Sequence, residues 1–330
     1  MIPGARRSVP GLLLLAAVAG AAYFLGDAIP FVTPLVLAIA VGALIANAVR
    51  LPAWAERGVA KHSALLEAGI VLLGASLSVE AIVAAGPMLV GLIGAVVAFG
   101  LALVQALSRL ADLEERMGSL LAAGSSVCGV SAIAAVAPVC DADESQIAHA
   151  AATILLFDAV TLVAFPAVGR LLDVAPRPFG VWIGLSMFST GPVAAAGFAH
   201  SSVAGQWATM TKLARNALIG VVAVWYSIRY TGRTAEAVDR PVWQVWIDFP
   251  KFLIGFVLVA LLTNVGAIPA GAVDPILTAS DALFLLAFAG LGFEIRLDEL
   301  RNAGVVPAVV VGAYLLAVSA VTYVLVGLLF

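Results

Sequence analysis

The segment Gly86-Pro-Met-Leu-Val-Gly-Leu-Ile-Gly-Ala-Val-Val-Ala-Phe-Gly-Leu-Ala-Leu-Val-Gln-Ala-Leu-Ser108 has no charged side chain from end to end. A helix needs about 20 predominantly apolar residues to cross a hydrocarbon core about 30 Å thick. Similar runs recur along the whole chain of 330 residues, of which 63% are apolar and 11% charged. Soluble domains carry about 25% charged residues. The composition therefore excludes a soluble globular protein and predicts an all-α, polytopic membrane protein.

The apolar runs predict about eleven transmembrane helices. Because the connections between the runs are short, we expect a single transmembrane domain over residues 1–330. Arg6 and Arg7 precede a first run that leads directly into further runs, and we interpret that run as a span and not as a cleaved secretion signal. The expected spans are Gly11–Leu25, Phe31–Val49, Ala64–Val79, Gly86–Ser108, Gly118–Val139, Ile147–Leu171, Phe179–Ala199, Gly205–Tyr230, Ile247–Asn264, Thr278–Phe293 and Ala303–Phe330.

The basic residues give this count an orientation. With a cytoplasmic N-terminus, every Lys and Arg except Lys212 and Arg215 falls in loops or helix ends on one side, whereas the opposite loop after Val139 is acidic. An excess of Lys and Arg in cytoplasmic loops is the positive-inside rule. The sequence therefore predicts the N-terminus inside and the C-terminus outside. The basic residues on the predicted inner side are Arg6, Arg7, Arg50, Arg57, Lys61, Arg109, Arg116, Arg170, Arg177, Arg229, Arg233, Arg240, Lys251, Arg296 and Arg301, and the acidic residues on the outer side are Asp141, Asp143 and Glu144.

Two segments of the chain resemble each other. Leu44–Pro52 and Leu261–Pro269 share a leucine, an asparagine (Asn47 and Asn264) and a proline, in the same order and at the same spacing. Asparagine and proline are uncommon in apolar helices, which favours a repeat over a chance resemblance, although chance remains the alternative.

A second match follows the first one. Leu73–Gly86 resembles Leu291–Gly304, with Gly74 matched by Gly292, and a single inserted position separates this match from the first. The predicted spans two to four, residues 31–108, thus correspond to spans nine to eleven, residues 247–330. Each span of the second copy comes seven spans after its counterpart in the first, and because seven is an odd number the copies must run in opposite directions. Secondary transporters often contain inverted repeats of this kind, with short or interrupted helices at the site, and the predicted third and tenth spans are both short.

Two further stretches combine helix breakers with hydroxyl groups. One is Gly124–Ser131 in the fifth predicted span, and the other is Ser186–Pro192 in the seventh. Glycine and proline loosen the helical hydrogen-bond ladder, and the freed amides can then face an anion; close helix packing is the alternative. The two stretches resemble each other loosely, yet by this count they run in the same direction. The candidate substrate-binding residues are Ser125, Ser126, Cys128, Gly129, Ser131, Ser189 and Thr190.

Two basic residues lie inside the eighth predicted span. Lys212 and Arg215 are three residues apart and share one helix face. Asp158, in the sixth span, lies at a comparable depth. Either Asp158 neutralises one cation while the other reaches outward, or the surplus positive charge attracts an anion in a water-filled cavity. In the second case we expect Arg215 to be the better anion ligand, because its planar fork forms two parallel hydrogen bonds.

With these residues in place, the sequence resembles the putative sulfate exporter family of bacterial inner-membrane proteins, within the cation/proton antiporter and anion transporter superfamily. The resemblance runs from Asn47 to the last helix, and its most specific parts are Gly124–Pro138 and Ala151–Phe157. Lys212-x-x-Arg215 fits the basic pair of that family, and Leu285–Gly292 fits its penultimate helix. The resemblance implies export of sulfate or a related sulfonate, and a location in the inner membrane.

The chain departs from that family at one place. Where the family usually has a histidine followed by an acid, this sequence has Phe188 and Ser189. Asp158 stands where the family commonly has a small residue. A proton step based on histidine is therefore not carried over, and Asp158 becomes the candidate coupling residue.

The favoured function is a secondary transporter that moves a small sulfate-like, sulfonate or carboxylate anion, coupled to H⁺ or Na⁺. An anion channel and a transporter with another small substrate are the alternatives. We expect neither an enzyme nor a cofactor or metal site, because His62, His149 and His200 are scattered near loop ends and no glycine-rich phosphate loop is present. The dispersed basic residues do not indicate nucleic-acid binding. The oligomeric state is open, with a homodimer as one alternative.

Overall fold

The computed structural model describes residues 3–26, 33–49, 51–76, 79–230, 252–296 and 304–330, and every regular element within these ranges is helical. The predicted all-α class is thereby confirmed. In these ranges, six segments are long and apolar enough to cross a membrane: Ser8–Gly26, Ala53–Ser76, Gly86–Leu110, Glu144–Leu171, Ala270–Glu294 and Val305–Leu329. The predicted starts of the second, ninth and eleventh spans (Phe31, Ile247 and Ala303) and the basic residues Arg50, Arg233, Arg240, Lys251 and Arg301 lie outside the described residues.

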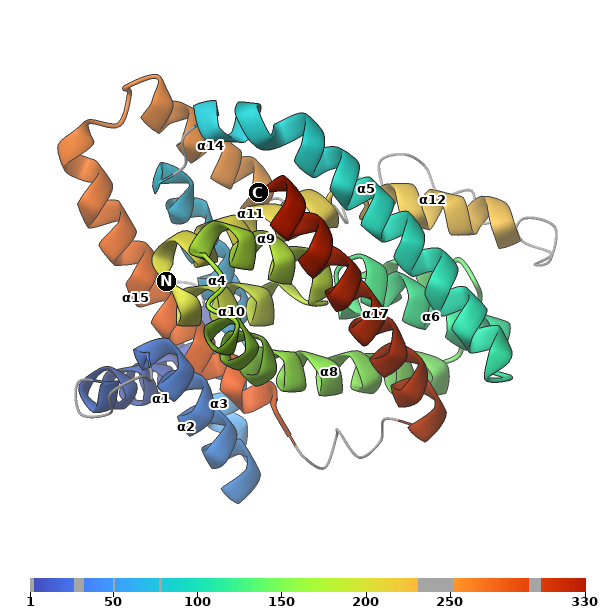
Figure 1. Ribbon diagram of the computed structural model, residues 1–330. Helices are drawn as coiled ribbons and strands as arrows, with labels where there is room; N and C mark the ends of the chain where they lie inside the picture. Colours follow the sequence, from blue (N-terminus) through green and yellow to red (C-terminus); the bar gives the residue numbers. More distant parts are fainter. Residues whose placement is uncertain (1–2, 27–32, 50, 77–78, 231–251, 297–303) are drawn as a thin grey trace. The chain divides into compact units, whose positions relative to one another are not determined.

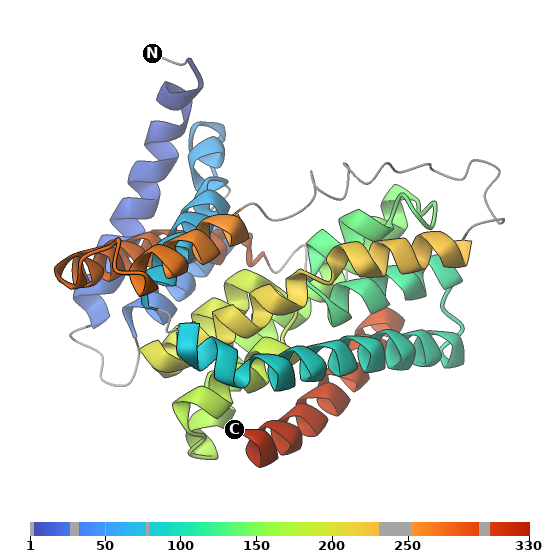
Figure 2. The same cartoon turned by 90° about the horizontal axis from the view of Figure 1, so that it is seen from above.

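The helices form two compact units, Met1–Ala85 with Pro250–Leu297, and Gly86–Phe249 with Asp298–Phe330. In the first unit the N-terminal helices pack with α15, although the whole of α5 to α12 lies between them in the chain (Figure 2). The helices of this unit are α1 (Pro3–Gly26), α2 (Pro34–Ala48), α3 (Ala53–Val59), α4 (His62–Leu73), the short 3₁₀ helix η1 (Gly74–Ser76), α14 (Phe252–Asn264) and α15 (Ala270–Glu294).

The two asparagines of the predicted repeat make the same local bond. Asn47 Nδ2 donates to the carbonyl of Ala43 (2.8 Å), and Asn264 Nδ2 donates to that of Ala260 (2.7 Å). Each asparagine lies at the C-terminal end of its helix, and the next helix begins after a proline in an extended conformation. Because the ring fixes φ near −65°, a proline is well suited to the start of a helix.

These proline starts correct two predicted spans. The tenth span was expected at Thr278–Phe293, but α15 begins at Ala270, directly after Pro269. The third was expected from Ala64, but the helical segment begins at Ala53, after Pro52. Neither segment is therefore short.

Two glycines allow close helix contacts in the first unit. A β-carbon at Gly292 of α15 would clash with the backbone of Ile39 and Ala43 in α2. A β-carbon at Gly74 would clash in the same way with Phe256 and approach Ala260, both in α14. Ile39 and Ala43 precede Asn47 by the same numbers of positions as Phe256 and Ala260 precede Asn264. The partners of the two glycines are therefore matched positions of the predicted repeat.

The second unit contains most of α5 and a set of shorter helices. The C-terminal helix α17 lies across α8 and contacts α9 (Figure 1). The helices are α5 (Val79–Leu110), α6 (Glu115–Ser126), α7 (Val130–Val136), α8 (Glu144–Leu171), α9 (Pro176–Ser186), α10 (Thr190–His200), α11 (Ser202–Asn216), α12 (Ile219–Tyr230) and α17 (Val305–Leu329).

Helices α6 and α7 form a hairpin, here called the first hairpin (Glu115–Val136). Arg116, at its start, forms an ion pair with Asp141, just beyond its end (3.2 Å). A continuous helix would separate these residues by about 37 Å. The chain reverses at Gly129, whose φ of 69° lies in the region that favours glycine. The fifth predicted span therefore folds back and does not cross in one pass.

Helices α9 and α10 form the second hairpin (Pro176–His200). The ring of Phe179, near its start, stacks on that of His200, at its end, with centroids 4.1 Å apart. His200 Nε2 also donates to the carbonyl of Val174 (3.0 Å), which precedes α9. The reversal occurs over Met187–Ser189, which is extended at both ends. The seventh predicted span thus also folds back on itself.

The two hairpins start from opposite ends of α8. Glu114, next to the first hairpin, accepts a hydrogen bond from Gln146 in the first turn of α8 (2.6 Å). Arg170, in its last turn, donates to the carbonyl of Ala199 in the second hairpin (2.9 Å). The acidic loop at Asp141 therefore lies at the same end as Arg116, contrary to the predicted placement of these residues on opposite sides. The fifth and seventh predicted spans each contain enough apolar residues for one crossing. A count based on composition therefore cannot tell a hairpin from a single crossing.

Thiol labelling tests the hairpins. In a variant with both native cysteines replaced by alanine, single cysteines would be introduced at Leu110, Glu144 and Ala175, which are exposed before the first hairpin, after it, and after α8. We expect a membrane-impermeant maleimide to label positions 110 and 144 from the same side and position 175 from the other. Labelling of positions 110 and 144 from opposite sides would show that the first hairpin crosses the membrane.

Candidate functional site

The tips of the two hairpins meet in the middle of α8. A β-carbon at Gly129, the tip of the first hairpin, would clash with the hydroxyl of Ser189 in the second. Asp158 lies midway along α8, is 3% exposed, and accepts a hydrogen bond from the backbone N–H of Ser189 (3.1 Å). The predicted clusters are therefore brought together, with the predicted coupling residue beside them.

Lys212 of α11 joins the two tips. Its ammonium group is fully buried and donates to the carbonyl of Val127 in the first hairpin (2.6 Å) and to that of Met187 in the second (3.3 Å). Val127 and Met187 are the residues that directly follow α6 and α9. One side chain thus bonds to the same structural position in both hairpins.

Arg215 lies one turn further along α11, is also fully buried, and bonds to both hairpins. Its Nε donates to Ser126 (2.7 Å) and its Nη2 to Ser125 (2.5 Å), both at backbone carbonyls of α6. Its Nη1 donates to the carbonyls of Leu185 and Met187, each at 2.8 Å. The guanidinium fork therefore spans the C-terminal ends of α6 and α9.

The bonds of Lys212 and Arg215 stabilise the C-terminal ends of α6 and α9 electrostatically. The last four carbonyls of a helix have no partner within it, and the helix dipole adds a partial negative charge there. Away from water, each unpaired carbonyl would cost about 1–3 kcal/mol. Two buried cations beside two such helix ends satisfy the carbonyls, and the helix ends in turn stabilise the buried charges. Lys212 and Arg215 therefore hold the hairpins in place.

The predicted hydroxyl residues separate into two groups. Ser125 and Ser126 are fully buried, as is nearly all of Cys128, and the hydroxyl of Ser125 donates back to the carbonyl of Leu121 (2.6 Å). Ser131, Ser189 and Thr190 retain accessible surface on the second unit. Ser125 and Ser126 are buried because they form the C-terminal end of α6, which Arg215 covers.

Residues 10–311 match the profile of the family described as "Conserved hypothetical protein 698". The chain belongs to this family. Relatives named "UPF0324 membrane protein" include one from Nitratidesulfovibrio vulgaris, 35% identical over 90% of this chain and 87% of the relative, and one from Agrobacterium fabrum, 34% identical over 90% and 86%. A relative from Streptococcus pyogenes is 29% identical over 90% of both chains. No solved structure matches the chain.

Family membership and the apolar helices together establish a multi-pass membrane protein. The position that departs from the sulfate-exporter pattern, Phe188, is fully buried and packs in an aromatic cluster with Phe157 and Tyr314, at centroid distances of 6.4 and 6.2 Å. In the part of the chain that the structure describes, no three His, Cys, Asp or Glu side chains gather as metal ligands would.

One residue of the site was missed in the sequence. Asn216 follows Arg215, is 7% exposed, and donates from Nδ2 to the hydroxyl of Thr190 (2.9 Å). The available signal was its place at the end of the polar run Thr209–Asn216, in a span expected to be apolar. The backbone carbonyl partners of Lys212 and Arg215 carry no sequence signal.

Arg215→Lys tests the proposed hairpin anchor. A lysine keeps the charge, but its ammonium group has three donors and no planar fork, so it cannot bond to all four of the carbonyls that Arg215 reaches. We expect the free energy of unfolding to fall by about 3 kcal/mol, measured as a lower Tm of the detergent-solubilised protein. Arg57→Lys, at an exposed arginine of α3, is the control and should leave Tm nearly unchanged. Equal Tm values for the two variants would contradict the anchoring role.

Proposed function

We propose that this protein is a secondary transporter whose substrate is a small anion, bound where the two hairpins meet. The observation that supports it is a pair of hairpins that approach from opposite ends of α8 and meet around the buried Lys212 and Arg215. Backbone that is not helical is tolerated at membrane depth only where protein or a water-filled cavity surrounds it. Transporters place discontinuous helices at their substrate sites for this reason.

The charge balance favours an anion. Lys212 and Arg215 carry two formal positive charges, and Asp158 carries one negative charge beside them. One positive charge is then left for a substrate, and burial strengthens its field. Arg215 would act through this field, since its donors bind carbonyls, while Ser131, Ser189 and Thr190 would supply hydrogen bonds at the accessible surface. Helix α10 begins at Thr190 without a side-chain cap, so its positive end adds to the attraction.

We further propose that the chain contains an inverted repeat. Three observations support it: the matched bonds of Asn47 and Asn264, the matched contacts of Gly74 and Gly292, and the matched carbonyls of Val127 and Met187. The loose resemblance between Gly124–Ser131 and Ser186–Pro192 is not expected of two spans that cross the membrane in the same direction. Hairpins that start from opposite ends of α8 are the arrangement that an inverted repeat would produce.

The orientation in the membrane is part of the same proposal. A hairpin returns the chain to the side from which it started, so the N-terminus inside and the C-terminus outside are retained in the bacterial inner membrane. Arg109, Arg116 and Arg229 stay on the inner side, at the base of the first hairpin. Arg170 and Arg177 move to the outer side, with the second hairpin. The inner side keeps the large majority of the basic residues, as the positive-inside rule requires.

Uptake into proteoliposomes tests the substrate class. Purified protein would be assayed with radiolabelled sulfate, a sulfonate and a dicarboxylate. Ser189→Ala and Thr190→Val should each lower uptake about tenfold, because a hydrogen bond to a charged group contributes about 1.5–3 kcal/mol. Ser202→Ala, at an exposed serine of α11, should transport normally. Saturable uptake with counterflow supports a transporter, and conductance without counterflow indicates a channel. If none of the anions is taken up, the proposal is wrong.

We also propose that Asp158 couples transport to protons. Its carboxylate accepts the N–H of Ser189, so protonation would weaken the bond that holds the tip of the second hairpin. Asp158→Asn should remove the pH dependence of uptake while leaving anion binding largely intact. The matched control is Asp173→Asn, at an exposed residue after α8. Unchanged pH dependence in Asp158→Asn would leave the carboxylate a structural counter-ion only.

A further inference from the structure

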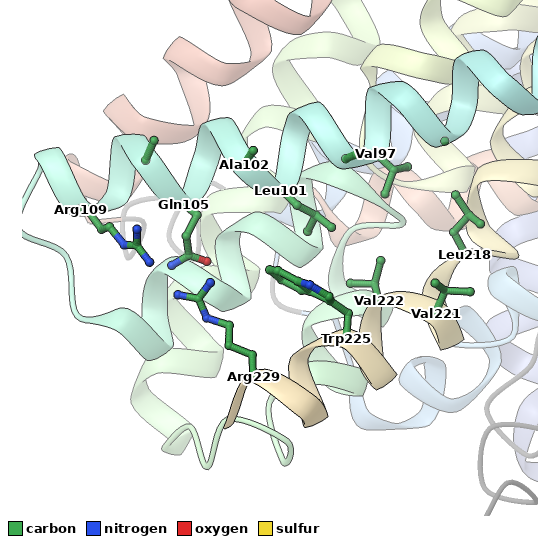
Figure 3. A pocket seen from close by; sticks show the side chains of 13 residues that line it. Val97, Leu101, Ala102, Gln105, Arg109, Leu218, Val221, Val222, Trp225 and Arg229 are labelled. Atoms are coloured by element: carbon green, nitrogen blue, oxygen red, sulfur yellow. The ribbon is translucent and has the colours of Figure 1, made fainter. Parts of the chain in front are cut away.

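A groove with a cavity volume of about 650 Å³ lies between α5 and α12 in the second unit (Figure 3). On α5 its floor is a row of small residues four apart, Gly94, Ala98, Ala102 and Ala106. Residues four apart on a helix stack on one face, so this row forms a smooth, shallow surface. The opposite wall consists of apolar side chains of α12, among them Val221, Val222 and Trp225.

One end of the groove is polar and basic. Figure 3 shows the side chains of Arg109, Gln105 and Arg229 together at this end, with Trp225 between them and the apolar part. Arg229 forms an ion pair with Glu115 (2.9 Å), and its guanidinium carbon lies 5.7 Å from the centroid of the Trp225 ring. Arg109 is exposed and, among the described residues, forms no ion pair, so its charge is available to an anion.

A buried polar group also faces this end. Gln105 is 5% exposed, and within the described ranges its Nε2 has no hydrogen-bond partner. A buried amide without a partner costs about 1–3 kcal/mol. An occupant that supplies an acceptor oxygen at this end of the groove would remove that cost.

The length of the groove fits one membrane leaflet. From Gly94 to Arg109 the helix rises about 22 Å, at 1.5 Å per residue. A bilayer including its headgroups is about 40–45 Å thick, so one leaflet is about 20–22 Å. An occupant with a charged head at Arg109 and an apolar body along the small-residue row has the dimensions of a phospholipid.

We propose that this groove binds one anionic phospholipid from the leaflet at the base of the first hairpin. The phosphate lies between Arg109 and Arg229, one of its oxygens accepts from Gln105 Nε2 after the buried amide turns toward the groove, and an acyl chain follows the row from Ala106 to Gly94. Basic pockets between membrane helices bind anionic headgroups in this way, and arginine binds phosphate through paired, charge-assisted hydrogen bonds. A helix of a second copy would fit less well. Its backbone carbonyls are already bonded within the helix, so they would not accept a hydrogen bond from Gln105.

Native mass spectrometry of the full-length protein in detergent tests the headgroup contact. The probes are phosphatidylglycerol and phosphatidylcholine with identical acyl chains. We expect tighter binding of phosphatidylglycerol, and Arg109→Gln should weaken it about tenfold while phosphatidylcholine binding is unchanged. Arg57→Gln makes the same charge change at an exposed residue of α3 and should have no effect. Equal binding of the two lipids, or equal loss in both variants, would overturn the proposal.

A pair of glycines tests the acyl path. A β-carbon at Gly94 or at Gly91 meets no other atom within 4 Å, so the first carbon of a side chain clashes with nothing at either position. Gly94 lines the groove and Gly91 does not. Gly94→Leu should abolish lipid binding, and Gly91→Leu should retain it. Unchanged binding in Gly94→Leu, or a dimer that this substitution disrupts, would show that another occupant fills the groove.

Discussion

The second unit depends on a requirement of the membrane interior, where every backbone polar group must find a partner within the protein. A hairpin that ends inside the bilayer violates this requirement at its tip, because the last carbonyls of its first arm have no donor within the helix. Lys212 and Arg215 supply donors to these carbonyls in both hairpins. The tips, the position of α11 and the burial of two charges all follow from this single arrangement.

Close packing makes the arrangement possible. In α9, Gly180 and Gly184 allow the backbone to approach α11, and Gly197 does the same for α10. A β-carbon at any of these glycines would clash with α11, which carries Lys212 and Arg215. Asp158 of α8 offsets part of the positive charge of Lys212 and Arg215, and its carboxylate accepts a hydrogen bond from Ser189.

Composition and periodicity predicted the helical class, the membrane location and the stretches where helices break. Gly124–Ser131 and Ser186–Pro192 contain both tips, and Lys212, Arg215 and Asp158 lie beside them, because breakers and charges are rare enough in apolar helices to stand out. The reversal at each tip could not be predicted, since a broken helix and a hairpin have the same composition. The contact of Arg116 with Asp141 decides between them. The partners of Lys212 and Arg215 could not be predicted either, because they are backbone carbonyls and every residue has one.

The bonds of Lys212 have a consequence for movement. One ammonium group serves the carbonyls of Val127 and Met187, which belong to hairpins that start from opposite ends of α8. If one tip withdraws, the ammonium loses a partner and depends more strongly on the tip that remains. Withdrawal of both at once would strand a buried charge, at a cost of several kcal/mol. The shared lysine therefore opposes withdrawal of both tips at once, and in the proposed transporter this would keep a continuous passage through the membrane from forming.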